Sequence, residues 1–355
     1  MPIEPAHLER SGPRSRSYRP LITIGIPTRN RASMVASAVQ RALAQSYTNI
    51  EVLVSDNAST DDTVTTLRSI ADPRLRILTS REDIGNSANY AKCIREARGE
   101  FVLVVPDDDK ISPTFLKKSV DLLIQEPGIQ AIVAAYGVFF ADENRERPAV
   151  LSSRLSTGIW DGTEILKEFL RGQLSAITLS MLIRTKLMQS SPWPTEYQTA
   201  DDVLAMARIL LSGRVALLNE QCATLTIHNS TVSNAFGLDH GFKETQEVME
   251  LISDASAGVI ADEASRCELQ DLTAHYVAKK LFDFLLLYRR QGASLSDVVR
   301  RFQFWRAQSR QCTLLHLAAA LRLRSVALLL LPAPATRRLL SLREIFQARG
   351  LSPAS

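Results

Sequence analysis

The chain has 355 residues, 45% of them hydrophobic and 23% charged, which suits one large globular domain or a domain with an appendage and excludes a disordered or fibrous protein. Its four cysteines are widely spaced without a CxxC pair and its five histidines are scattered, which excludes a zinc-type cluster and indicates reduced thiols in a cytoplasmic protein. The net charge of +4 is unevenly spread: residues 281–355 hold 12 arginines and 3 acids, a charge of +9, which leaves −5 on the rest of the chain.

The two ends of the chain carry no recognisable membrane signal. Residues 1–18 are rich in Arg, Pro and Ser and lack an apolar core, so they are predicted to form a disordered basic arm rather than a secretory signal. Residues 312–331 are apolar but contain Arg322 and Arg324, which argue against a membrane-spanning helix.

Strand and helix patterns alternate from residue 21 onward. A β-branched run over 21–26 predicts a strand that Pro27 ends, and a helical pattern follows. Strands are predicted over 21–26, 50–55, 75–78, 101–105, 129–136, 180–183 and 215–227, and helices over 32–44, 63–70, 84–97, 113–125 and 201–211. From about Gly241 the pattern is helical to the end. Strands that alternate with helices indicate βαβ units and a mostly parallel α/β sheet flanked by helices.

An acidic triplet, Asp107-Asp108-Asp109, follows the apolar run 101–105 directly. Neighbouring carboxylates repel one another, and a divalent metal is the usual compensation for such a cluster. Because open α/β sheets bind ligands beyond the carboxyl ends of their strands, the triplet predicts a metal-assisted site for a phosphate-bearing substrate. The alternative is an ordinary Asp-rich turn before a helix.

Three other predicted strands also end in polar residues: 27–30, 56–59 and 79–81. Neighbouring parallel strands would place these segments along one edge of the sheet. Asp56 is then suited to bind a base or ribose, and Arg81 to pair with a phosphate. The chain has no GxGxxG or GxxxxGK[ST] motif, which argues against a dinucleotide fold or a P-loop.

Several ordered motifs together resemble family-2 glycosyltransferases over residues 21–233. The strings that carry the resemblance are Ile-Gly-Ile-Pro-Thr-Arg-Asn-Arg at 24–31, Gln-Ser-Tyr at 45–47, Ile-Glu-Val-Leu-Val-Ser-Asp-Asn-Ala-Ser-Thr-Asp at 50–61, Gly-Asn-Ser-Ala-Asn at 85–89, and the strand that leads into the triplet at 99–109. The resemblance implies a GT-A fold and transfer of a sugar from a nucleoside-diphosphate sugar to an acceptor hydroxyl, with Mg²⁺ or Mn²⁺ and with inversion at the anomeric carbon.

The same resemblance assigns the donor side of the site. The implied donor-binding residues are Pro27, Thr28, Arg29, Asp56, Asn57, Arg81, Asn89, Asp107 and Asp108. The implied metal ligands are Asp108 and Asp109. Pro106 stands where many members of the family have an acid, which leaves the division of roles within the triplet open.

A second acidic pair, Asp201-Asp202, resembles the segment that carries the catalytic base in this family, and Asp202 takes that position. Inversion needs a carboxylate that removes the proton of the acceptor hydroxyl as the new bond forms. The alternative is that both acids only favour the start of a helix. Asp201 and His228 are secondary site candidates. The family often has an Arg two residues before this His, where this chain has Thr226.

The expected organisation is a basic arm over 1–18, a GT-A domain over 19–238 and an Arg-rich helical region over 239–355. In the last region Phe302, Phe304 and Trp305 lie among arginines, which suits peripheral contact with the inner face of the cell membrane or packing against protein. Trp160 and Trp193 are expected to line an acceptor pocket or to pack in the core. The acceptor is expected to be a sugar or a lipid-linked sugar.

The leading hypothesis is a glycosyltransferase of surface polysaccharide or glycolipid synthesis. A nucleotidyltransferase on a similar sheet would need a Gly-rich basic loop after the first strand, where this chain has residues 27–30. A non-catalytic module that binds nucleotide sugars would be expected to have lost one of the two acidic sites. Nucleic-acid binding by residues 281–355 has no accompanying motif.

Overall fold

The computed structural model describes residues 17–191, 193–228, 238–290 and 292–308. The chain divides between His228 and Asn229 into two compact units, a sheet unit and a helical unit. The predicted arm over 1–18 and the basic residues from 309 onward lie almost wholly outside the described residues. The predicted domain boundary at 238/239 stays a prediction, since residues 229–237 are not described.

The sheet unit is built on one mixed sheet, and its first half is parallel. Strand β1 pairs with β2 on one side and with β4 on the other, and β2 pairs with β3. These four strands are β1 (Ile22–Thr28), β2 (Ile50–Asp56), β3 (Leu75–Thr79) and β4 (Phe101–Val104). The register joins Thr28 to Asp56 at the carboxyl end, so polar residues on neighbouring strands end up side by side.

The second half continues the sheet in the order β4, β9, β6, β10 and β5. Strand β9 is antiparallel to both neighbours, β6 and β10 run parallel to each other, and the short strands β5, β7 and β8 pair antiparallel. Their bounds are β5 (Lys110–Ile111), β6 (Ala131–Phe140), β7 (Arg145–Arg147), β8 (Gly158–Asp161), β9 (Met181–Arg184) and β10 (Arg214–Ile227). As a result β1, β2, β4, β6 and β10 all end at the same edge of the sheet.

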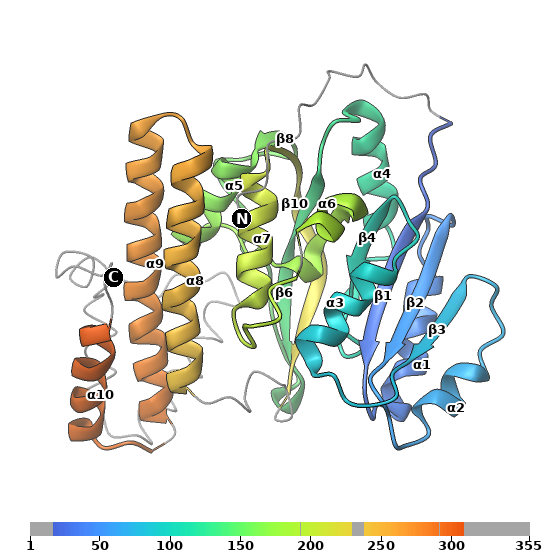
Figure 1. Cartoon of the computed structure of the whole chain (residues 1–355), viewed down its shortest axis with the longest axis horizontal. Helices are drawn as coiled ribbons and strands as arrows, with labels where there is room; N and C mark the ends of the chain where they lie inside the picture. Colours follow the sequence, from blue (N-terminus) through green and yellow to red (C-terminus); the bar gives the residue numbers. More distant parts are fainter. Residues whose placement is uncertain (1–16, 192, 229–237, 291, 309–355) are drawn as a thin grey trace. The chain divides into compact units, whose positions relative to one another are not determined.

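Helices cover both faces of this sheet (Figure 1). Helix α1 packs against β1 and β2 through one buried face. The buried residues of that face, at helical spacing, are Val35, Ala38, Val39 and Ala42. The helices of this unit are α1 (Ala32–Leu43), α2 (Thr63–Arg68), α3 (Asn86–Glu96), α4 (Phe115–Gln125), α5 (Gly162–Arg171), α6 (Thr185–Ser190) and α7 (Asp201–Leu211), with short 3₁₀ turns at η1 (Ala141–Glu143) and η2 (Thr178–Ser180).

Helix α3 lies on the opposite face of β1 from α1, and glycines allow its placement. A Cβ atom on Gly25 would lie 2.8 Å from the Cβ atom of Cys93, so only glycine lets α3 approach the strand this closely. The helix begins after Gly85, whose φ of 83° is a conformation that other residues rarely adopt. These two glycines fix where the first turn of α3 lies relative to the strand ends.

The predicted α/β architecture is confirmed, with one correction at a strand end. Strand β1 continues through Pro27 to Thr28, although Pro27 was predicted to end it. The pairing between β1 and β4 stops at Gly25 and Val104, so the missing N–H of Pro27 costs no ladder bond on that side. Helix α5 and strands β7 and β8 lie in a polar segment for which no element was predicted.

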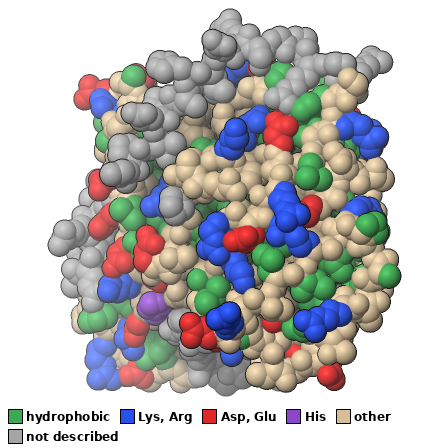
Figure 2. Space-filling model, turned by 45° about the vertical axis from the view of Figure 1, so that its right-hand side comes forward, with side chains coloured by type: hydrophobic (Ala, Val, Ile, Leu, Met, Phe, Trp, Pro, Cys, Tyr) green, Lys and Arg blue, Asp and Glu red, His purple; other side chains and the backbone are tan. Residues whose placement is uncertain are grey.

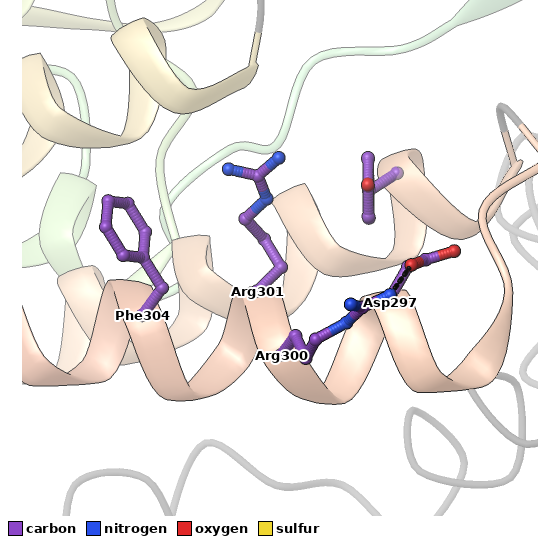
Figure 3. A pocket seen from close by; sticks show the side chains of 5 residues that line it. Asp297, Arg300, Arg301 and Phe304 are labelled. Carbon is purple, nitrogen blue, oxygen red and sulfur yellow. Dashed lines mark hydrogen bonds and ion pairs between the residues drawn. The ribbon is translucent and has the colours of Figure 1, made fainter.

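The helical unit consists, in its described part, of α8 (Leu238–Val259), α9 (Glu263–Arg290) and α10 (Leu295–Gln308). Phe242 of α8 stacks on Trp305 of α10 with ring centroids 5.0 Å apart. The side chains of Arg301 and Trp305 both donate to Asp239, at 2.6 and 2.7 Å. A pocket of about 250 Å³ on this unit is lined by Tyr288, Asp297, Arg300, Arg301 and Phe304. Figure 3 draws these side chains.

Charged side chains of both signs are interspersed on the face drawn in Figure 2. Of the 12 arginines in residues 281–355, seven follow residue 308 and lie outside the described part of the chain. Within the described helices, none combines the length and the apolar character that crossing a membrane requires.

Candidate functional site

The three carboxylates of the acidic turn have three different surroundings. Asp107 accepts a 2.6 Å hydrogen bond from the hydroxyl of Thr28 at the end of β1. Asp109 is buried and accepts a 2.7 Å bond from the backbone N–H of Thr226 in β10. Asp108 lies between them and keeps 16% of its side chain exposed. Of the three acids, Asp108 is therefore the one presented to a ligand.

Basic side chains surround the acidic turn. Nε2 of His228 lies 2.9 Å from Oδ2 of Asp108, and the guanidinium of Arg31 lies 4.0 Å from the same oxygen. Arg41 of α1 donates to the main-chain oxygens of Asp107 and Asp109 at 3.4 and 3.3 Å. Arg41 thus holds the turn by its backbone, while the middle carboxylate, Asp108, faces the His228 ring and the Arg31 guanidinium.

Burial leaves part of this negative charge uncompensated. Burial, together with the charge of Asp108, raises the pKa of Asp107 to about 6, against the opposing effect of the Thr28 hydrogen bond. The same two causes raise the pKa of Asp109 well above its ordinary value. A site of this kind gains stability from an added cation, which would hold the carboxylates in their charged form.

The donor set fits a hard divalent ion such as Mg²⁺ or Mn²⁺, because it consists of carboxylate oxygens. Among the described residues, no group of three or more acidic, His or Cys side chains is arranged to enclose a metal by itself. Mg²⁺ in nucleotide-dependent enzymes commonly uses one or two carboxylates and completes its shell with phosphate oxygens and water. Asp108, with Asp107 beside it, meets that requirement.

The end of β2 carries the second part of the site. Asp56 is 2% exposed, and its Oδ2 accepts a 3.2 Å bond from the N–H of Ser59. Its Oδ1 is buried and has no hydrogen-bond partner in the described part of the chain. Because an unsatisfied buried carboxylate oxygen is costly, a hydroxyl or N–H donor of a ligand is the natural partner.

The neighbouring Asn57 organises the loop between β3 and α3. Its amide nitrogen donates to Asp83 at 2.6 Å, and its amide oxygen accepts from the N–H of Ile84 at 2.9 Å. Arg29 forms an ion pair of 2.5 Å with the same Asp83. Arg81, two residues before Asp83 in the same loop, is exposed. Arg29, Asn57 and Arg81 therefore lie around one loop at the carboxyl edge of β1, β2 and β3.

Two further predicted donor-binding residues are buried as well. Pro27 is a buried residue of β1. Asn89 is 2% exposed. Its amide oxygen accepts from the hydroxyl of Ser55 at 2.7 Å, and its amide nitrogen donates to the main-chain oxygen of Ser55 at 2.9 Å. The side chain of Asn89 thus acts on the residue that precedes Asp56.

The second acidic pair occupies the first turn of α7. Asp201 accepts from the hydroxyl of Ser87 at 2.8 Å and from the indole N–H of Trp193 at 2.9 Å. Its other oxygen accepts from the N–H of Asp202 at 3.0 Å. Oδ1 of Asp202 accepts a 2.7 Å bond from the N–H of Val203. Asp201 is therefore engaged by three donors from the protein itself.

Sequence reasoning gave no role to three side chains that contact the acidic residues: Arg31, Arg41 and Ser87. Arg31 and Ser87 stood inside quoted motifs. Trp193 was expected to line an acceptor pocket or to pack in the core, and its indole N–H donates to Asp201. The role expected for Trp160, lining an acceptor pocket or packing in the core, stays a prediction. The structure pairs Trp160 with Val215 at the start of β10, the end of that strand opposite to His228. Only side-chain packing, which sequence spacing does not encode, separates the two tryptophans.

Comparison with known proteins agrees with this geometry. Residues 23–189 match the family described as "Glycosyl transferase family 2". The succinoglycan biosynthesis protein ExoO of Rhizobium meliloti is 30% identical over 102 residues, which are 29% of this chain and 29% of ExoO. The matched segment spans about a third of the length of ExoO and of an uncharacterised glycosyltransferase of Rickettsia typhi, which is 31% identical over 110 residues.

Two solved structures share the fold. TarS of S. aureus, residues 1–349 in complex with UDP-GlcNAc, superposes with a TM-score of 0.63 at 18% identity, over 94% of this chain and 93% of that one. The mannosyltransferase PcManGT of Pyrobaculum calidifontis, in complex with GDP-Man and Mn²⁺, gives a TM-score of 0.53 at 16% identity, over 95% and 87%. The fold is thus that of GT-A glycosyltransferases, and the segment 23–189 of this chain belongs to glycosyl transferase family 2.

Proposed function

We propose that this protein is an inverting, metal-dependent glycosyltransferase that moves a sugar from a nucleoside-diphosphate sugar to an acceptor hydroxyl. One observation carries the proposal: Asp56 at the end of β2 and the Asp107-Asp108 pair after β4 lie at the same edge of the sheet, on either side of β1, and Oδ1 of Asp56 is buried without a hydrogen-bond partner among the described residues. That edge is where open α/β sheets bind nucleotides. Membership of residues 23–189 in family 2 supports the same activity.

The donor nucleotide is assigned to the edge formed by β1, β2 and β3. Asp56 accepts a hydrogen bond from the base or the ribose, since its free oxygen can only accept. Thr28 holds Asp107 at the ribose and sugar side. Arg29, Asn57 and Arg81 form the loop beside the nucleotide, and the two arginines give this loop positive charge. Pro27 precedes Thr28 in β1, and Asn89 binds Ser55 in the interior.

Asp108 is assigned as the carboxylate that holds Mg²⁺ or Mn²⁺, with His228 at its side. The metal, when bound, stabilises the negative charge that develops on the leaving diphosphate. Asp109 was also implied as a ligand, but its Oδ1 already accepts the N–H of Thr226. We therefore assign Asp109 the task of fixing the turn. PcManGT, a neighbour in fold, binds Mn²⁺ together with GDP-Man.

Asp202 is assigned as the general base. It removes the proton of the acceptor hydroxyl as that oxygen bonds to the anomeric carbon and the bond from this carbon to the diphosphate oxygen breaks. Asp201 is a poorer base, because three hydrogen bonds stabilise its charged form. Attack by the acceptor opposite to the leaving group accounts for inversion.

The acceptor is proposed to be a sugar or a lipid-linked sugar in the synthesis of a surface polysaccharide or glycolipid, and the relative ExoO is a succinoglycan biosynthesis protein. Peripheral contact with the inner face of the membrane, from the cytoplasm, belongs to the same proposal. Its support is that α10 exposes Leu295, Val299 and Phe304 together with Arg300. A nucleotidyltransferase or a binding module without catalysis is less well supported, since both acidic sites are present.

A panel of nucleoside-diphosphate sugars tests the function directly. Each donor is incubated with the full chain and Mn²⁺ or Mg²⁺, and release of the nucleoside diphosphate is measured, because water can replace the acceptor slowly. One donor should be turned over in a metal-dependent way and should raise the melting temperature. If no donor is turned over and none binds in the presence of either metal, the proposal fails.

A further inference from the structure

Trp193 lies in the loop between α6 and α7, and its side chain is buried although most loop side chains are exposed. It is 6% exposed, and its ring stacks on Tyr90 of α3 with centroids 4.2 Å apart and an interplanar angle of 29°. Its indole N–H lies 2.9 Å from Oδ2 of Asp201 and 3.1 Å from the hydroxyl oxygen of Ser87. Buried Trp N–H groups are normally hydrogen-bonded, and this one is directed at the first turn of α7.

Ser87 completes a closed arrangement with these two residues. Its hydroxyl, in a side chain that is 3% exposed, donates to the same Oδ2 of Asp201 at 2.8 Å. One carboxylate oxygen therefore receives two donors, from the first turn of α3 and from the loop before α7. Hydrogen bonds to a charged acceptor are about twice as strong as neutral ones, so this arrangement holds the turn firmly.

Helix α3 also contacts the donor side of the site. The hydroxyl of Tyr90 donates to the main-chain oxygen of Val104, the last residue of β4, at 3.3 Å. Three residues later the chain enters the acidic turn. Asn89 holds Ser55, which precedes Asp56 in β2. The first two turns of α3 thus contact three elements: the strand before the metal-binding acids, the strand before Asp56, and the helix that begins with Asp201 and Asp202.

We propose that Trp193 and Ser87 are positioning residues, which clamp Asp201 to α3 and thereby set Asp202 at a fixed place relative to the acidic turn. This inference rests on the proposed function, in which Asp202 is the base. A base must lie within hydrogen-bond reach of the proton that it removes, and a misplacement of about 1 Å can lower a rate about a hundredfold. Asp201 then takes no part in proton transfer. Its hydrogen bonds to Trp193 and Ser87 fix the position of the adjacent Asp202.

The variant Trp193→Phe tests the clamp while it keeps an aromatic ring to stack on Tyr90. Using the donor on which the wild-type chain is most active, we expect kcat to fall about ten- to a hundredfold. The affinity for the corresponding nucleoside diphosphate should stay within about twofold, because the nucleotide contacts lie at β1, β2 and β3. Trp160→Phe is the matched control: its indole N–H donates at 2.8 Å to the main-chain oxygen of Ser156 and not to an acid of α7, so kcat should not change.

Two further variants distinguish a positioning role from a loss of folding. Ser87→Ala leaves Trp193 in place, removes the second donor to Asp201, and should also lower kcat, while its melting curve shows the variant fully folded at the assay temperature. In an Asp202→Asn background, Trp193→Phe should cause no additional loss of turnover, because the clamp acts only through Asp202. A general disturbance of the site would lower the residual rate further.

The outcomes separate this inference from the proposed function. If the wild-type chain is active and both Trp193→Phe and Ser87→Ala match it in kcat, the clamp is wrong and the function stands. The clamp is also overturned if nucleotide affinity falls together with kcat, or if the loss persists without the carboxylate of Asp202. A wild-type chain that turns over no donor overturns the function and the clamp together.

Discussion

Asp109 accepts a 2.7 Å hydrogen bond from the backbone N–H of Thr226, and this bond joins the acidic turn after β4 to the end of β10. Two residues after Thr226 the chain reaches His228, whose Nε2 lies 2.9 Å from Oδ2 of Asp108. The third acid of the triplet therefore brings a histidine from 120 residues away in sequence to the second acid. This connection explains how three adjacent carboxylates differ in role.

Replacing the proposed base should separate chemistry from binding. Asp202→Asn keeps the shape of the side chain and removes its ability to take a proton, so turnover should fall by at least about a hundredfold, the lower end of the usual general-base contribution. Metal-dependent binding of the nucleoside diphosphate, measured by calorimetry, should persist. Asp108→Asn is the companion variant, and it should lower both turnover and metal-dependent binding. Normal turnover by Asp202→Asn would remove this residue as the base.

The raised pKa values of Asp107 and Asp109 predict that the metal-free protein is less stable at higher pH. A carboxyl whose pKa is higher in the folded than in the unfolded state binds more protons when folded, so stability falls as pH rises. For Asp107 the loss should run from about pH 4, its unfolded pKa, to about pH 6, its folded pKa. Denaturant midpoints measured from pH 4 to 7 without metal test this, and a midpoint that rises through this interval would count against it.

Asp109→Asn is the matched variant for that pH series. The amide oxygen can still accept from the N–H of Thr226, while the buried charge is gone. We therefore expect the metal-free variant to be more stable than the wild type at pH 7, with a shallower fall between pH 4 and 7. Metal-dependent nucleotide binding should be retained if Asp108, and not Asp109, holds the ion. Loss of metal binding in Asp109→Asn would return Asp109 to the ligand set.

Much of the donor side could be predicted from the sequence, because it depends on local patterns. The apolar runs that became β1, β2 and β4 place Thr28, Asp56 and Asp107 at their ends, and parallel pairing brings these ends together. The roles within the triplet could not be predicted in this way. They depend on the 117-residue separation between Asp109 and Thr226, and sequence spacing says nothing about which backbone N–H reaches a given carboxylate.

The same limit applies to Trp193 and Trp160. Both are tryptophans in segments with weak secondary-structure signals, and nothing in either segment shows which will face α7. The structure separates them through β8, which pairs Trp160 with Val215 at the start of β10, and through Tyr90, on which Trp193 stacks. Tertiary packing, rather than composition, decides which tryptophan bears on the site.

A buried network beneath the site should govern stability at acidic pH. Glu51 of β2 is 8% exposed and accepts from Arg76 and from the hydroxyl of Thr23, each at 2.7 Å. Although burial alone raises its pKa, the hydrogen bonds from Arg76, Thr23 and the N–H of Arg98 hold it below the ordinary value. A lowered pKa contributes stability above the unfolded value, about pH 4, that is lost as pH falls further.

Glu51→Gln removes this charge and leaves the Arg76 guanidinium without its anion. Removing one partner costs about 3 to 5 kcal/mol in a fully buried pair and less in this partly buried one, where Arg76 is 20% exposed, so the melting temperature should still drop clearly at pH 7. The drop should shrink below about pH 4, where the wild type loses the same charge. Glu96→Gln is the control, because the ion pair of Glu96 with Arg95 is largely exposed and such pairs contribute at most about 1 kcal/mol. Equal destabilisation by both variants would contradict the proposal that the Glu51 network contributes more to the free energy of unfolding than an exposed ion pair does.

Membrane contact by the helical unit should depend on one exposed aromatic side chain of α10. Phe304 is 51% exposed beside Arg300, and aromatic and basic groups together suit the interface of an anionic bilayer. The full chain should sediment with vesicles that contain phosphatidylglycerol and much less with phosphatidylcholine alone, and salt should weaken the binding. Phe304→Ser should reduce the bound fraction without changing donor turnover. Val259→Ser is the control, a comparably exposed apolar residue at the end of α8, at 42%. If wild-type binding is equal for both vesicle types, or Phe304→Ser binds as well as the wild type, α10 is not the contact surface.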